Sequence, residues 1–103
     1  MEPLPVQPVD RDTLRGIFNS GRFYERVLDG ELSQLVISSR PASPLSNQPR
    51  GTMSEEVEYY SASDAVARVH QFVLPDGSLG ASGRPDPKAV LSDGILYVLG
   101  RDL

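Results

Sequence analysis

The sequence predicts an α+β domain, with one or two short N-terminal helices packed on a small, mostly antiparallel sheet of three or four strands. Two observations favour this class. Apolar residues recur at helical spacing early in the chain, and the later apolar segments are β-branched or alternating and end at glycine or proline turns. The 103 residues also match the commonest size of a single domain.

The start of the chain has a composition of its own. Residues 1–9 contain three prolines, which fix φ and cannot donate an amide hydrogen bond. We therefore interpret residues 1–9 as an extended N-terminal arm and residues 10–103 as one α+β domain. Such an arm either packs on the domain or extends away from it, and its terminal position favours the second arrangement.

Two short helices, or one helix broken at Gly21, are predicted in the first third of the chain. The apolar face of the first helical run comprises Leu14, Ile17 and Phe18. The carboxylate of Asp10 or Asp12 can accept hydrogen bonds from the free amides at the start of this run. A second run begins at Phe23 and stops at Gly30. We expect both runs to pack on the sheet.

Three segments are predicted as strands, although the first could also continue a helix. Residues 32–38 contain the β-branched run LVIS, which favours a strand over a continued helix. Residues 55–61 alternate apolar and polar side chains, and residues 95–99 form a short apolar run after a Ser-Asp-Gly turn. These segments would supply most of the sheet.

Residues 65–74 fit two structures. A helix capped by Ser63 would gather its valines on one face, whereas a strand would form a β-hairpin with residues 55–61 across the turn SASD. The valine content and the abrupt stop at PDG favour the strand. In that case one face of the strand carries Arg68, His70 and Phe72.

Two irregular stretches separate these segments. Residues 40–54 hold three prolines and three serines without apolar periodicity, and we interpret them as a mobile loop. Residues 75–88 read PDGSLGASGRPDPK and open with a tight turn. Asp86 is a favourable N-cap and Pro87 suits the first helical position, so a one-turn helix is expected near residues 87–92.

The glycine-rich stretch 75–88 is also the candidate ligand-binding site. Its glycine spacing matches neither the dinucleotide fingerprint nor the P-loop. Successive amides can still form an anion nest, although the carboxylate of Asp86 would compete for them. We therefore interpret the stretch first as a structural connection and second as an anion or partner site. The candidate ligand-binding residues are Gly77, Gly80, Gly83, Arg84 and Lys88.

Composition excludes several chemistries. The chain has no cysteine, which removes disulfides, thiolate zinc sites and thiol nucleophiles, and one histidine excludes multi-histidine zinc sites. The acidic run at Glu55, Glu56 and Glu58 is interpreted as a solvated strand edge rather than a Mg²⁺ or Ca²⁺ contact. We predict no metal site and no cofactor.

Charge and hydropathy limit the classes of partner that the protein could bind. The net charge is −4, and the nine arginines and one lysine form no dense basic run, so we do not expect nucleic acid to be a partner. No window approaches the length of apolar sequence that a transmembrane helix needs. The first ten residues lack the basic and apolar regions of a secretory signal, so we expect a cytoplasmic protein.

The leading functional hypothesis is a small protein-interaction or regulatory module without catalysis, with a protein partner or a homo-oligomer. It depends on the missing catalytic motifs, the acidic charge and the two long loops. The alternative is a small metal-independent ribonuclease-type toxin, in which His70 would transfer protons and Arg68, Arg84 and Lys88 would bind phosphate, aided by Tyr59 or Tyr60.

Overall fold

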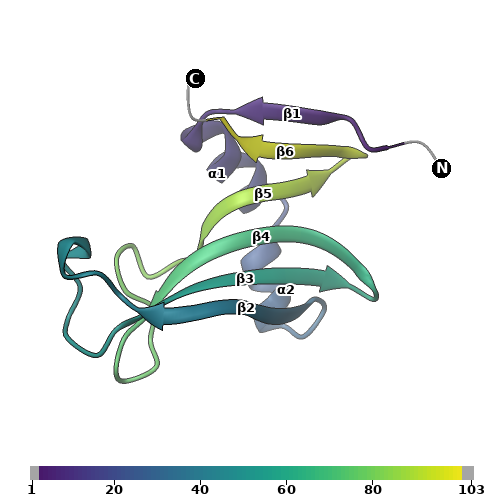
Figure 1. Ribbon diagram of the computed structural model, residues 1–103. Coiled ribbons are helices and arrows are strands. Elements are labelled where there is room, and N and C mark those ends of the chain that lie inside the picture. The colour runs from purple at the N-terminus through teal and green to yellow at the C-terminus, as the bar shows by residue number, and fades with distance from the viewer. Residues whose placement is uncertain (1–2, 101–103) are drawn as a thin grey trace.

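The computed structural model, which describes residues 3–100, confirms the α+β class: two helices lie on a six-stranded mixed, mostly antiparallel sheet (Figure 1). In chain order the elements are β1 (Val6–Val9), α1 (Arg11–Ser20), α2 (Phe23–Leu28), β2 (Ser33–Pro41), the 3₁₀ turn η1 (Pro44–Ser46), β3 (Met53–Ser61), β4 (Asp64–Val73), β5 (Asp86–Ser92) and β6 (Ile95–Leu99).

The strand order is β1-β6-β5-β4-β3-β2. Neighbouring strands are antiparallel except β1, which runs parallel to β6. Figure 1 shows both helices on the same face of this curved sheet, so that one face is covered and the other is open within the described residues. No helix in residues 3–100 has the length and apolarity needed to cross a membrane.

The two helices form where the sequence predicts them. Asp10 caps α1, because its carboxylate accepts a hydrogen bond from the Thr13 amide at 2.7 Å. Gly21 ends α1, and a Cβ at this position would overlap the ring of Phe23. The chain then turns through Arg22, which has a left-handed backbone, and α2 begins at once. The glycine therefore allows the two helices to pack closely at their junction.

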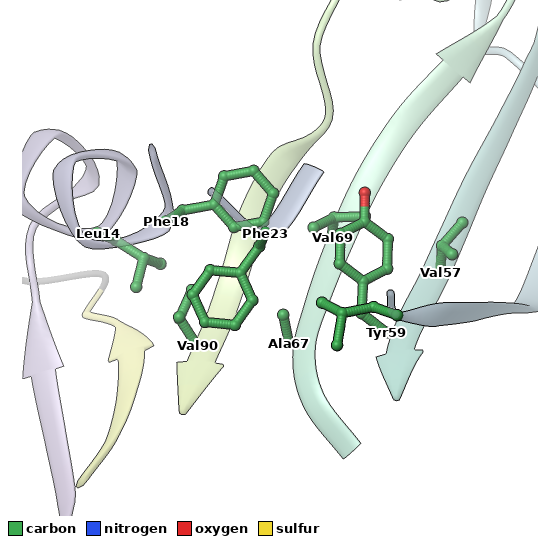
Figure 2. Close-up of a cluster of buried hydrophobic side chains, with 9 residues drawn as sticks. Leu14, Phe18, Phe23, Val57, Tyr59, Ala67, Val69 and Val90 are labelled. Carbon is green, nitrogen blue, oxygen red and sulfur yellow. The ribbon is translucent and has the colours of Figure 1, made fainter. Parts of the chain in front are cut away.

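The core lies between the helices and the middle of the sheet. The rings of Phe18 and Phe23 stack with centroids 5.8 Å apart, and Tyr59 meets Phe18 at 6.1 Å (Figure 2). Beneath these rings the sheet contributes its fully buried aliphatic side chains, which are Val57, Val69 and Val90. Burial raises the pKa of the Tyr59 hydroxyl far above its ordinary value, so this side chain stays neutral and belongs to the core.

The hairpin hypothesis for residues 65–74 is confirmed, since β3 and β4 pair as antiparallel neighbours. The four predicted strand segments are all strands, with bounds that shift by a few residues. The interval between β2 and β3 is shorter than the expected loop at residues 40–54, because β2 runs to Pro41, β3 starts at Met53, and η1 lies between them.

The one-turn helix expected near residues 87–92 is wrong, because this segment is strand β5. A strand there buries Val90 completely and gives β4 a second hydrogen-bonding neighbour. Pro87 is tolerated because the register of the β4–β5 pair shifts beside its partner Val69, where the ladder is irregular. Burial and pairing thus override the local helix-start signal.

The sheet has more strands than the three or four predicted. Besides β5, the extra strand is β1, which lies within the stretch interpreted as an extended arm. The Leu96 amide donates to the carbonyl of Pro5, and the Gly100 amide donates to that of Val9. Residues 6–9 therefore pair with β6 instead of extending away from the domain.

Candidate functional site

The predicted acid–base residues lie on the open face of the sheet. Val69 points into the core, so its neighbours Arg68 and His70 project to the other side, as the sequence predicts. The His70 ring meets Phe72 edge-on at 4.8 Å, and its Nε2 lies 2.7 Å from the Ser54 hydroxyl on β3. The structure thus forms a serine–histidine pair across two strands.

The imidazole of His70 is neutral at neutral pH. Burial lowers its pKa below the ordinary 6.5, and the positive charge of Lys88 lowers it further, while Asp86 and Glu56 act in the opposite direction. A neutral ring can accept a hydrogen bond through Nε2, and the hydroxyl of Ser54 can donate it. This bond ties β3 to β4 on the open face.

The pair lacks the surroundings of a nucleophilic site. Asp86 is the register partner of His70 on β5, but its carboxylate binds Arg15 at 3.2 Å and Lys88 at 3.0 Å. Ser54 sits within the β3–β4 ladder, opposite Phe72, where backbone amides already serve strand pairing. An oxyanion needs free, converging donors, which this strand does not supply. The pair is therefore best explained as a polar bridge.

The cations assigned to phosphate binding are each engaged by a carboxylate. Arg68 binds Glu58 at 2.8 Å, and Lys88 binds Asp86. Arg84 binds Glu25 of α2 at 2.8 Å, and its guanidinium lies 5.2 Å from the centre of the Tyr24 ring. The fold thus brings Lys88 close enough to influence His70 but directs Arg84 toward the helices.

The remaining predicted residues are also bonded to neighbours. The Tyr60 hydroxyl donates to Glu58 at 2.8 Å, and this hydrogen bond raises the pKa of Tyr60. Glu55 accepts a hydrogen bond from Gln71 at 3.1 Å. Within residues 3–100, no three histidine or acidic side chains converge to hold a metal ion.

The backbone amides of the three glycines in the stretch 75–88 donate hydrogen bonds to nearby backbone carbonyls. The amide of Gly77 donates to Leu74 at 2.8 Å, that of Gly80 to Phe72 at 2.9 Å, and that of Gly83 to Gly80 at 3.0 Å. An anion nest needs free amides. This geometry gives the anion-site hypothesis no support from the three glycines and favours the structural connection.

Gly80 marks the place where the two long loops meet. A Cβ there would lie 2.5 Å from the Gln48 side-chain oxygen and 2.9 Å from Leu74. A Cβ at Gly51 would likewise lie 3.2 Å from Pro75. The loops therefore pack on each other at one end of the sheet, where Figure 1 also places them.

The surface that sequence reasoning missed is strand β2. It is the last strand in the sheet order, and within residues 3–100 only β3 pairs with it. All nine of its residues are exposed, and three consecutive apolar side chains are among them: Leu35 at 54%, Val36 at 47% and Ile37 at 38%. We call this strand, with its unpaired outer backbone groups, the β2 edge.

The β2 edge has little protection against pairing. Natural edge strands are usually short, or carry lysine, inward charges or proline. The β2 edge contains no carboxylate and no lysine, and Arg40 and Pro41 stand only at its end. Its one irregularity is a bulge between Val36 and Ser38 in the pairing with β3. The middle of the strand is therefore available to another strand.

A groove continues this surface onto the helix-covered face. It has a volume of about 510 Å³ and is lined by Tyr24, Val27 and Leu28 of α2, Gln34 of β2 and Leu79 of the β4–β5 loop, among others. Leu28 is 67% exposed. Apolar surface thus extends from the strand to α2.

The sequence did contain a signal for the β2 edge. A strand with one buried face alternates apolar and polar residues, but β2 places its three large apolar side chains consecutively between polar pairs. Such a run is typical of a strand whose two faces are both covered.

No family model, curated protein or solved structure matches this chain.

Proposed function

We propose that this protein is a non-catalytic interaction module that binds a protein partner by adding a strand of the partner to the β2 edge. The observation that carries the proposal is an edge strand of nine exposed residues with three adjacent apolar side chains. Strand addition is a common mode of protein recognition, in which backbone hydrogen bonds supply affinity and side-chain contacts supply selectivity.

Covering the apolar side chains of the β2 edge would contribute favourably to the binding of a partner strand. Full burial of a Leu, Val or Ile side chain stabilises by about 1.5–3 kcal/mol. Leu35, Val36 and Ile37 retain roughly half of their exposure, so a covering strand would regain about half of that amount for each. The outer backbone groups of β2 would at the same time replace water with ladder hydrogen bonds.

The ribonuclease hypothesis has less support. Its cations are engaged in ion pairs, its candidate Tyr59 is buried, and Tyr60 donates to Glu58. To bind a phosphate, Arg68 or Lys88 would first have to leave its carboxylate. The open face also carries Glu56, which would repel a phosphate backbone.

Selection of linear peptides from a display library against the purified protein tests the proposal. We expect the selected peptides to slow amide hydrogen exchange in residues 33–41 and to bind Val36→Lys about tenfold or more weakly. The matched control is Leu45→Lys, at a side chain that is 95% exposed in η1 and lies off the β2 edge. Peptides that protect another surface, or that bind both variants equally, would overturn the proposal.

A further inference from the structure

We infer that the strand that pairs with the β2 edge is β2 of a second copy, so that the protein forms a twofold-symmetric dimer in which two six-stranded sheets become one. This inference rests on the proposed function and names its partner. A twofold interface uses the same surface on both copies, so the surface must complement itself. The sequence of β2 meets this condition.

The residues around Val36 are arranged almost symmetrically. From Ser33 to Ser39 the strand reads SQLVISS, which is two polar residues, three apolar residues and two polar residues. An antiparallel pairing centred on Val36 sets this residue opposite its own copy. It also sets Leu35 opposite Ile37. Each of the three apolar residues then meets an apolar one. Beyond Ile37 the bulge places Ser38, the partner of Glu56, on the open face, whereas Gln34, the partner of Tyr59, lies on the helix-covered face, so the symmetric pairing is confined to residues 35–37.

The face that Val36 occupies agrees with this pairing. Val36 is the register partner of Val57, which is buried against the helices, so Val36 lies on the helix-covered face. A twofold axis perpendicular to the sheet keeps the helices of both copies on one face. The two Val36 side chains therefore meet on that face, beside the groove that Gln34 lines.

Charges do not oppose the contact at the edge. Arg40 is the only charged residue of β2, and it lies at the end of the strand, away from Val36. Each copy does carry a net charge of −4, which repels the other at longer range. Salt screens such repulsion, so we expect the dimer to tighten as ionic strength rises.

The dimer also closes on itself. Pairing consumes the β2 edge of each copy and leaves β1 at both outer ends of the joined sheet. β1 is four residues long and contains Pro8, so it offers a poor template for a further strand. Strand pairing alone gives a small interface, and we therefore expect a dimer that dissociates on dilution.

A cysteine placed at the symmetry axis tests the inference directly, because the natural chain contains none. In Val36→Cys the two thiols would face each other, and oxidised glutathione should link them into a disulfide dimer. The control is Leu45→Cys, which is exposed but away from the β2 edge. We expect Val36→Cys to cross-link at least about tenfold faster, because pairing raises the local thiol concentration.

The register has its own test. Leu35→Cys alone should cross-link slowly, whereas a mixture of Leu35→Cys and Ile37→Cys should form the mixed disulfide. Sedimentation of the wild type should show a concentration-dependent dimer, and Leu35→Glu should sediment as a folded monomer by circular dichroism. These results together would support a β2–β2 dimer.

Other results would contradict it. A monomeric wild type, with Val36→Cys no faster than Leu45→Cys, would overturn the inference. If selected peptides still bound at β2, the proposed function would survive and only the identity of the partner would be wrong. A dimer that persisted in Leu35→Glu would place the contact elsewhere and overturn the inference as well.

Discussion

The two edges of the sheet differ in length, composition and pairing. β1 has four residues, runs parallel to β6 and contains Pro8, whereas β2 has nine residues, no proline before its last position and no charge before Arg40. The carbonyls of Pro5 and Val9 point to β6, so the alternate positions Val6 and Pro8 direct their backbone groups outward. Pro8 thus removes a donor from the free side. The β1 edge is therefore protected against pairing with a further strand, whereas the β2 edge is not.

A second contrast separates β2 from the strands it extends. β3 and β4 bury Val57, Tyr59 and Val69, but every residue of β2 is exposed. Substitutions in the core should therefore change folding, and substitutions in β2 should change association. This difference makes the role of the edge testable.

The largest effect is expected in the core. Phe18→Ala removes a buried ring that stacks on Phe23 and contacts Tyr59, and it should lower the free energy of unfolding by about 3–5 kcal/mol. Urea unfolding of the purified variant measures this change. A loss below about 1 kcal/mol would contradict the placement of Phe18 at the centre of the core.

The edge should respond in the opposite way. Val36→Lys should leave the free energy of unfolding of the monomer within about 1 kcal/mol of wild type, because the side chain is half exposed. The same variant should lose self-association in sedimentation velocity. A variant that unfolds instead would show that β2 belongs to the core, and the contrast drawn above would fail.

The loop junction is intermediate. Gly80→Ala would press a methyl group against Leu74 and the side chain of Gln48, and overpacking of this kind costs about 1–3 kcal/mol. Thermal unfolding measures the loss. Gly77→Ala is a poor control because its φ is positive, whereas Gly16→Ala meets no neighbour and should be neutral or stabilising.

The blocked edge offers a smaller, sharper test. Pro8→Val restores an outward donor on β1 and should allow species larger than a dimer at high protein concentration. Light scattering on wild type, Pro8→Val and the double variant Pro8→Val/Val36→Lys separates the two edges. If Pro8→Val behaves like wild type, the short length of β1 rather than its proline protects that edge.

The smallest effect concerns pH. The lowered pKa of His70, caused first by burial and then by Lys88, means that the unfolded chain binds more protons than the folded chain just below pH 6.5. The free energy of unfolding should therefore fall as pH drops through this range. His70→Gln should show a shallower slope between about pH 7 and 5, measured by urea unfolding. An equal slope in both proteins would contradict a half-buried His70 with a lowered pKa.

Much of the fold could be predicted because its signals are local. The helix cap at Asp10, the stop at Gly21 and the β3–β4 hairpin all follow from short patterns that the structure keeps. β5 could not be predicted in this way. Asp86-Pro87 resembles a helix start. The segment forms a strand instead because it pairs with β4 and buries Val90, and neither contact is visible in the local sequence.

The β2 edge was also harder to predict, because it depends on contacts between distant parts of the chain. The sequence indicates a strand at LVIS, but its position at the end of the sheet depends on pairing between distant segments. The candidates chosen by residue type gave a different result. Histidines often transfer protons and glycine-rich loops often bind anions, but here His70 bonds to Ser54 of the neighbouring strand and the glycine amides donate to nearby backbone carbonyls.

Amide hydrogen exchange as a function of protein concentration tests the central claim most directly. We expect the amides of residues 33–41 to be protected at high concentration and to exchange faster on dilution, while those of β1 stay unchanged. Val36→Lys should exchange rapidly in β2 at every concentration. Exchange in β2 that is independent of concentration in the wild type would contradict the assignment of the β2 edge as a self-pairing surface.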